Sequence, residues 1–243
     1  MIKYLALSVF FVSAMVSAGE VDELVKSAKL IFEDDFNRTE KDDSKEELGK
    51  EWVTNSKQRA KGVKQCDLTG ENVKITMAKV ADHGVSMRHD APFHNGIILS
   101  RFKINDPKGM SFNFNDPAAK KVTWAGHIAG INLKPGKLTI EDHITGKFDL
   151  KIREMRQGKD AAKKKEAAKI LNEKQKTFKL DISVNKWYEI AIVFQGPKAS
   201  VFIDGKKAGE FESEGLNHKV KQNIAFAVSG TVEIDYLKIY TLD

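Results

Sequence analysis

The chain has 243 residues, of which 41% are hydrophobic and 30% charged, a composition typical of a soluble globular protein. It excludes disordered and collagen-like classes, and a core of this size needs no disulfides. The lone cysteine, Cys66, excludes an internal disulfide framework and any multi-cysteine metal cluster. The formal net charge of +6 leaves open a solvated basic surface or a polyanionic partner.

The first 18 residues predict a cleaved signal peptide. Lys3 is followed by an apolar stretch from Tyr4 to Val16, and small residues then stand at the −3 and −1 positions of a cleavage site after Ala18. The stretch is shorter than the ~20 residues that span a bilayer, although an uncleaved anchor is the alternative. We expect a periplasmic or secreted protein with no membrane attachment after cleavage. Because exported proteins rarely meet nucleic acid, acidic polysaccharide is the preferred polyanion and no nucleic-acid partner is expected.

A polar lead, residues 19–29, precedes a series of short segments with period-two patterning, which predicts half-buried antiparallel strands. Asp204-Gly205 suits the tight turn of a hairpin. The one break is an Ala-, Lys- and Glu-rich stretch that predicts an inserted surface helix at about 155–175. We therefore expect an all-β fold, a two-sheet sandwich forming a single domain over residues 30–243. The expected strands lie at 30–36, 51–53, 73–77, 97–104, 110–114, 127–133, 137–140, 177–184, 187–194, 198–204, 208–212, 223–228 and 231–242.

Three segments carry a family resemblance. The aromatic-led strand Trp187-Tyr188-Glu189-Ile190, the hairpin Val201-Phe202-Ile203-Asp204-Gly205-Lys206 and the final strand Val232-Glu233-Ile234-Asp235-Tyr236 resemble concanavalin-like jelly rolls, laminin-G-like modules included. Phe32-Glu33-Asp34-Asp35-Phe36, followed by Trp52, is similar to the first strand of that group. The chain looks most like exported bacterial proteins with a 3-keto-disaccharide hydrolase domain, which are related to laminarinase-type glycosidases. The resemblance implies a concanavalin-like jelly roll that acts on carbohydrate.

The same resemblance implies a structural calcium. The first and last strands of such folds commonly pair, which would bring Asp34 and Asp235 together at one edge. Calcium prefers several oxygen ligands, so solvated or capped carboxylates are the alternative, and no other cofactor is expected. The laminarinase-type signature E-x-D-x-(x)-E is only half matched, at Glu233-Ile234-Asp235, with the third carboxylate missing.

Half of the six histidines fall within residues 82–95, which suggests a catalytic groove. A concave sheet could combine an imidazole base, a carboxylate and a guanidinium, and such groups could abstract a proton and stabilise an enolate. A zinc site at His83, His89 and His94 is an alternative, although the spacing matches no strong ligand motif, and a polar loop is another. The predicted catalytic residues are His89, Asp90, Arg101, His127 and His143, and the predicted substrate-binding residues are Arg88, His94, Trp124 and Asp142.

The functional expectation is a carbohydrate-active hydrolase of glycosidic bonds in keto-disaccharides or related glycans, whose partner is an oligosaccharide or polysaccharide. The alternative is a non-catalytic glycan-binding jelly roll in which aromatic side chains stack on sugar faces. A purely structural envelope protein is a third class. The sequence does not define the sugar or the oligomeric state.

Overall fold

The computed structural model describes residues 12–123 and 125–243, with side chains from residue 19 onward. The first 11 residues of the expected signal peptide and Trp124 therefore lie outside the described residues. None of the helices in the described ranges is long and apolar enough to span a membrane.

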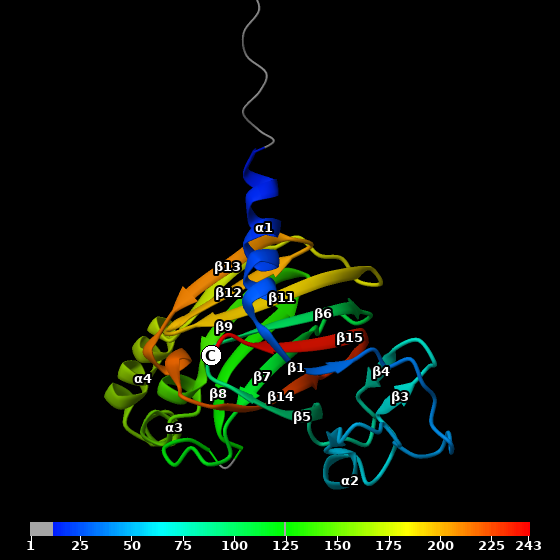
Figure 1. Ribbon diagram of the computed structural model, residues 1–243. Helices are drawn as coiled ribbons and strands as arrows, with labels where there is room; N and C mark the ends of the chain where they lie inside the picture. The colour runs from blue at the N-terminus through cyan, green and yellow to red at the C-terminus, as the bar shows by residue number, and fades with distance from the viewer. Residues whose placement is uncertain (1–11, 124) are drawn as a thin grey trace, which may run out of the picture.

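Two antiparallel sheets pack face to face as a jelly-roll sandwich (Figure 1). The eight-stranded sheet has the order β13-β12-β11-β6-β15-β4-β3, and β1 also pairs with β15. Its strands are β1 (Lys29–Asp34), β3 (Cys66–Leu68), β4 (Val73–Thr76), β6 (Gly96–Ile104), β11 (Trp187–Gln195), β12 (Lys198–Ile203), β13 (Lys206–Glu212) and β15 (Thr231–Thr241).

The seven-stranded sheet has the order β10-β9-β8-β7-β14-β5-β2. Its strands are β2 (Val53–Thr54), β5 (Val85–Phe93), β7 (Met110–Asn115), β8 (His127–Lys134), β9 (Gly136–Asp142), β10 (Gln175–Leu180) and β14 (Lys221–Val228). Alternate side chains point inward, so that Phe112, Phe114 and Phe226 of this sheet meet Phe102 and Phe194 of the other in one core cluster. Cys66 belongs to the same core, and burial raises the pKa of its thiol well above the usual value.

The polar lead is part of a helix. Helix α1 (Val12–Ser27) crosses the expected cleavage position and lies against the outer side of the eight-stranded sheet (Figure 1). Val21 is buried there with Ile97, Val193 and Phe202. An apolar patch on the back of the sandwich is thereby removed from water, which favours the docked position of the helix.

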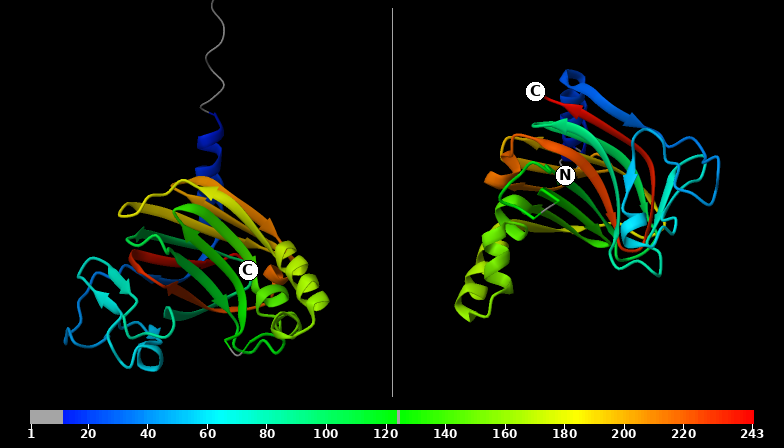
Figure 2. Two further views of the ribbon diagram at one scale, coloured as in Figure 1. Left: turned by 180° about the vertical axis from the view of Figure 1, so that it is seen from behind. Right: turned by 90° about the horizontal axis from the view of Figure 1, so that it is seen from below.

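The inserted helix expected at about 155–175 is present as α4, and the insertion holds two further helical pieces before it. A π-helical turn, η1 (His143–Lys147), leads into α3 (Leu150–Gln157) and then α4 (Ala161–Glu173). Gly158 separates the two helices, and the carboxylates of Asp149 and Asp160 accept hydrogen bonds from the first free N–H groups of α3 and α4. These helices lie at one end of the sandwich, whereas α2 (Ser56–Arg59) lies with β3 and β4 at the other (Figure 2). A short 3₁₀ turn, η2 (Glu214–Asn217), precedes β14.

Candidate functional site

Two of the predicted histidines come together on the outer face of the seven-stranded sheet. His127 begins β8 and His143 follows β9, and their ring centroids are 5.9 Å apart with the rings perpendicular. Phe148 packs against both, with centroid distances of 4.0 Å to His127 and 4.8 Å to His143. The pair forms because the π-helical turn carries the chain from β9 back over β8, the strand on which His127 lies.

Glu141 holds His143 in place. Its Oε2 lies 2.9 Å from Nε2 of His143 and accepts a hydrogen bond of 2.7 Å from the Asn132 side-chain amide. The Ser111 hydroxyl in turn donates to the Asn132 carbonyl oxygen at 2.5 Å. A polar chain thus runs across β7, β8 and β9. Because an ionised carboxylate only accepts hydrogen bonds, Nε2 of His143 carries the proton and the lone pair of a neutral ring lies at Nδ1.

The electrostatics keep this carboxylate ionised. Burial alone would raise the pKa of Glu141, but the hydrogen bond and charge of His143, the charge of Lys147 and the Asn132 amide outweigh it and lower the pKa to about 2. Burial, with repulsion from His143 and Lys147, lowers the pKa of His127 to about 4. Among the described residues, the Nδ1 atoms of both histidines are buried without a hydrogen-bond partner. Buried unpaired polar atoms cost free energy, and they mark this cluster as a functional candidate.

Small residues make room for the cluster. The outward side chains form rows across the sheet, and one row runs through Arg88, Ala225, Asn113, Gly130 and Glu141. The ring of His143 lies directly over Gly130, where an added Cβ would come within 2.4 Å of its Cε1. Glycine at this position is therefore what allows the imidazole to lie flat on β8.

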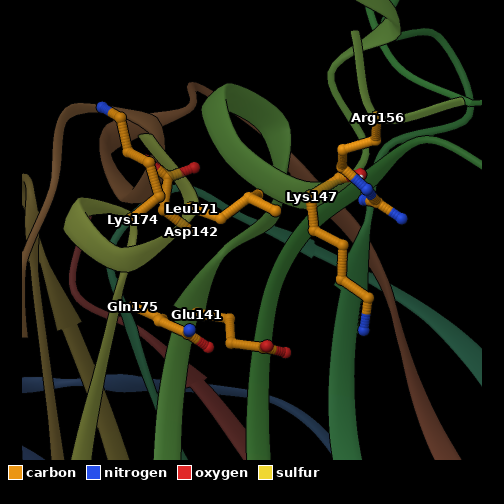
Figure 3. Close-up of a pocket in the computed structure, with 7 residues that line it drawn as sticks. All are labelled: Glu141, Asp142, Lys147, Arg156, Leu171, Lys174 and Gln175. Atoms are coloured by element: carbon orange, nitrogen blue, oxygen red, sulfur yellow. The ribbon is translucent and has the colours of Figure 1, made fainter. Parts of the chain in front are cut away.

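A pocket of about 360 Å³ opens beside Glu141 (Figure 3). It lies where the ends of β9 and β10 meet η1, α3 and α4. Its lining residues are Glu141, Asp142, Lys147, Arg156, Leu171, Lys174 and Gln175. Figure 3 shows the basic ends of Lys147 and Arg156 on the side of the pocket away from Lys174.

Three other predicted residues do not join the cluster, and their expected place in one groove is wrong. His89 points into the core, stacked on Phe32 at 3.7 Å between centroids, because residues 85–93 form a strand rather than a polar loop and odd-numbered positions face inward. Burial lowers the pKa of His89. His94 lies at the end of β5, with its Nε2 3.0 Å from the Asn217 side chain. Arg101 belongs to the other sheet, where it pairs with Asp235.

The remaining predicted residues lie apart from the His143 cluster or outside the described residues. Arg88 and Asp90 are exposed on the outer face of β5, and Trp124 lies outside the described residues. Asp142 points away from that face and accepts hydrogen bonds from Thr145, Ser213 and Gly215. The zinc alternative does not fit either, since no group of three potential ligands is assembled among the described residues.

Asp34 and Asp235 do not fit a calcium site. Asp34 accepts hydrogen bonds from Arg38 at 2.6 and 2.8 Å and from the Trp52 indole at 2.8 Å. Asp235 faces Arg101 at 2.9 Å on the outer side of the sheet. Burial opposes the effect, but Arg38 and the other donors lower the pKa of Asp34. Both carboxylates are therefore capped by arginine, which takes the place that a cation would need.

The outer face also lacks a close carboxylate pair. Among the described strands of this sheet, only Asp90 and Glu141 present carboxylates outward, and β14, β7 and β8 separate their strands. Four strand spacings correspond to about 19 Å along the sheet. Paired-carboxylate glycosidases need separations of about 5–5.5 Å or 6.5–9.5 Å. The strands therefore do not present the two carboxyl groups of that mechanism.

Comparison with known proteins finds the same fold in glycan hydrolases. A laminarinase from Flavobacterium sp. UMI-01 is similar with a TM-score of 0.53 and 16% identity, covering 87% of this chain and 100% of that one. The laminarinase catalytic domain of Thermotoga maritima MSB8 has a TM-score of 0.53 and 12% identity over 88% and 98% of the two chains. An endo-β-galactosidase from Clostridium perfringens reaches 0.56 at 8% identity, over 88% of this chain and 63% of that one.

These similarities show the fold, a concanavalin-like jelly roll like that of the glycan hydrolases. A non-specific endo-β-1,3(4)-glucanase of family GH16 also shares it, with a TM-score of 0.53 and 13% identity over 89% and 92% of the chains. No protein-family model and no curated protein matches the sequence.

Proposed function

We propose that the protein is an exported enzyme that cleaves glycosidic bonds in glycans bound across the outer face of the seven-stranded sheet, with His143 as the proton acceptor. The observation that carries the proposal is the hydrogen bond between Glu141 and Nε2 of His143. A carboxylate on one ring nitrogen fixes the tautomer and leaves the lone pair of the other nitrogen to accept a proton. Since the sheet offers no close carboxylate pair, proton abstraction is favoured over attack by a carboxylate nucleophile.

A keto-disaccharide, the finer substrate expected from the sequence, suits this chemistry. A 3-keto group acidifies the neighbouring C2–H, and His143 would take that proton. The C–H electron pair then forms a C1=C2 double bond, the C1–O bond breaks, and the leaving oxygen takes a proton from the imidazolium. Addition of water across the double bond completes a net hydrolysis. The Asn132 amide is the group beside the cluster that could stabilise the enolate oxygen.

The test is turnover of 3-keto and unmodified disaccharides by the protein and by His143→Gln. A positioned general base contributes about 10²–10⁴-fold, so we expect a loss of that size in His143→Gln. His94→Gln is the matched control, because His94 lies at the end of β5, where its Nε2 is 3.0 Å from the Asn217 side chain, and does not join the cluster. Turnover by His143→Gln at the wild-type rate would reject the proposed base.

A non-catalytic glycan-binding module is the second candidate. The His143 side chain is only 4% exposed and its Nδ1 is buried, so substrate must first displace the covering side chains for proton transfer to occur. If the cluster never opens, it serves only to stiffen a polar binding face. Glycan binding without turnover of any disaccharide or polysaccharide would favour this second function.

A further inference from the structure

The positive charge of the protein is concentrated in one part of the chain. Residues 120–179 contain 16 lysines and arginines against seven aspartates and glutamates. This excess of nine is larger than the net charge of +6 of the whole chain, so the rest of the protein is slightly acidic. The segment lies between β7 and the end of β10, and all seven residues that line the pocket beside Glu141 belong to it.

Within that pocket, two cations have no carboxylate partner among the described residues. The Lys147 ammonium lies 5.5 Å from the centre of the Phe148 ring, and the Arg156 guanidinium donates to the Lys147 carbonyl oxygen at 2.9 Å. Neither forms an ion pair, whereas Lys174 is paired with Glu214 at 2.9 Å. Both unpaired side chains belong to exposed residues.

The acidic residues of the pocket form no ion pair with these cations among the described residues, and each is held by other donors. Glu141 is held by His143 and Asn132, and Asp142 by Thr145, Ser213 and Gly215. The lining thus carries three basic side chains against two carboxylates, and Lys147 and Arg156 are the two whose charges are not paired with a described carboxylate. Guanidinium and ammonium groups in such a setting recognise carboxylates and sulfates through charge-assisted hydrogen bonds.

We propose that this pocket is a subsite for an anionic sugar unit, so that the glycan bound by the protein is acidic. This inference rests on the proposed function for its location, since Glu141 belongs both to the pocket lining and to the His143 cluster. A volume of about 360 Å³ lies within the usual range of small-ligand sites. Lys147 and Arg156 bind the anionic group, and the rest of the glycan extends along the sheet.

An acidic glycan fits this surface better than nucleic acid. None of the seven residues that line the pocket is aromatic, whereas single-stranded nucleic acid is bound on aromatic stacking platforms. Lys147 and Arg156, which have no carboxylate partner among the described residues, both line this one pocket. Such a pocket suits one anionic sugar ring, whose neighbouring sugar units in the glycan can be neutral or charged.

The experiment measures binding of a polyuronate oligomer, a sulfated neutral-sugar oligomer, a carboxyl-reduced polyuronate oligomer and a DNA oligonucleotide to the mature protein. We expect an acidic oligomer to bind at least about tenfold more tightly than the neutral one, the difference that one or two charge-assisted hydrogen bonds supply. Comparison of the polyuronate oligomer with the sulfated oligomer shows whether the bound anionic group is a carboxylate or a sulfate. Lys147→Gln/Arg156→Gln should lose that preference.

The matched control is Lys163→Gln/Lys165→Gln, which removes the same charge from the exposed surface of α4. It should retain the preference for the acidic oligomer, and circular dichroism checks that both variants fold. Equal weakening in the two double variants, equal binding of the neutral oligomer, or tighter binding of DNA would each overturn the subsite. Acidic-glycan binding without turnover would instead count against the proposed catalysis alone, and cleavage of keto-disaccharides without acidic preference would count against the subsite alone.

Discussion

The outer faces of the two sheets are both polar, but their charged and polar side chains are paired to different extents. On the eight-stranded sheet, charged side chains pair across neighbouring strands. Arg101 lies 2.9 Å from Asp235 and 3.7 Å from Glu189, and Lys103 lies 2.8 Å from Glu233. Trp187 is covered by Arg101 and Lys103, and helix α1 covers an apolar patch of the same sheet. The charged side chains named here are thus paired with residues of the same face.

On the seven-stranded sheet, polar groups are buried in one corner and left partly unsatisfied. The Nδ1 atoms of His127 and His143 are buried without a hydrogen-bond partner among the described residues, and the neighbouring Lys147, which is exposed, has no ion pair there. Burying such groups costs free energy that a merely structural face would avoid by pairing them, as the other sheet does. The comparison therefore favours the proposal that the seven-stranded sheet is the face that binds a ligand.

The largest expected effect is that of Gly130→Ala. The new methyl would lie 2.4 Å from Cε1 and 2.7 Å from Nε2 of His143, so the ring must leave its position beside Glu141. Overpacking of this kind costs about 1–3 kcal/mol, and displacement of the ring should also abolish the activity that depends on it. Chemical denaturation and disaccharide turnover measure the two effects.

A double-mutant cycle separates the steric clash from any intrinsic cost of alanine in β8. In a His143→Ala background the ring is absent, so Gly130→Ala should cost little. If the cost of Gly130→Ala is the same with and without His143, the ring does not depend on the glycine.

Acid titration gives the next effect. The folded-state pKa of Glu141 is about 2, below the ordinary value of 4.5, so its contribution to stability is present above pH 4.5 and lost as pH falls toward 2. A difference of this size corresponds to at most about 3 kcal/mol. Glu141→Gln should remove this part of the pH dependence, measured as the free energy of unfolding between pH 2 and 5.

Glu189→Gln is the matched control, since Glu189 carries a carboxylate on the outer face of the other sheet and is 49% exposed. Its pH dependence should remain close to that of the unmodified protein. An identical acid profile for the protein and Glu141→Gln would contradict the strong pKa shift and weaken the assignment of an ionised partner for His143.

Much of the fold follows from sequence pattern. Period-two alternation locates most strands, including the hairpin at Asp204-Gly205, which the structure shows as β12 and β13. The strand at 85–93 is missed because its histidines and acids suggest a polar loop, although Val85, Met87, Ala91 and Phe93 alternate as in a strand. The same alternation places His89 in the core. Local composition was therefore a poorer guide there than periodicity.

The site is only partly predictable. His127 and His143 are found from the sequence, but Glu141 is passed over in favour of Asp142. Alternation from Leu138 and Ile140, which face inward, would have shown that Glu141 faces outward and Asp142 inward. The return of His143 onto Gly130 depends on the π-helical turn and on contacts between distant strands, which no local pattern encodes. Lys147 and Arg156 are likewise brought to the pocket only by the packing of the inserted helices.

The smallest expected effect comes from the side of the sandwich that satisfies its own charges. Arg101→Ala removes the pairing with Asp235, but the Arg101 side chain is 41% exposed, and exposed ion pairs contribute about 0–1 kcal/mol. Glycan turnover should be unchanged, because Arg101 lies in β6 of the eight-stranded sheet and its side chain contacts Asp235, Glu189 and Trp187 rather than the His143 cluster. Asp235→Asn, which weakens the same pair from the other side, should behave alike in unfolding and turnover. A large loss of turnover in Arg101→Ala with normal stability would move the functional face to the eight-stranded sheet, since only direct contact with substrate explains such a selective loss.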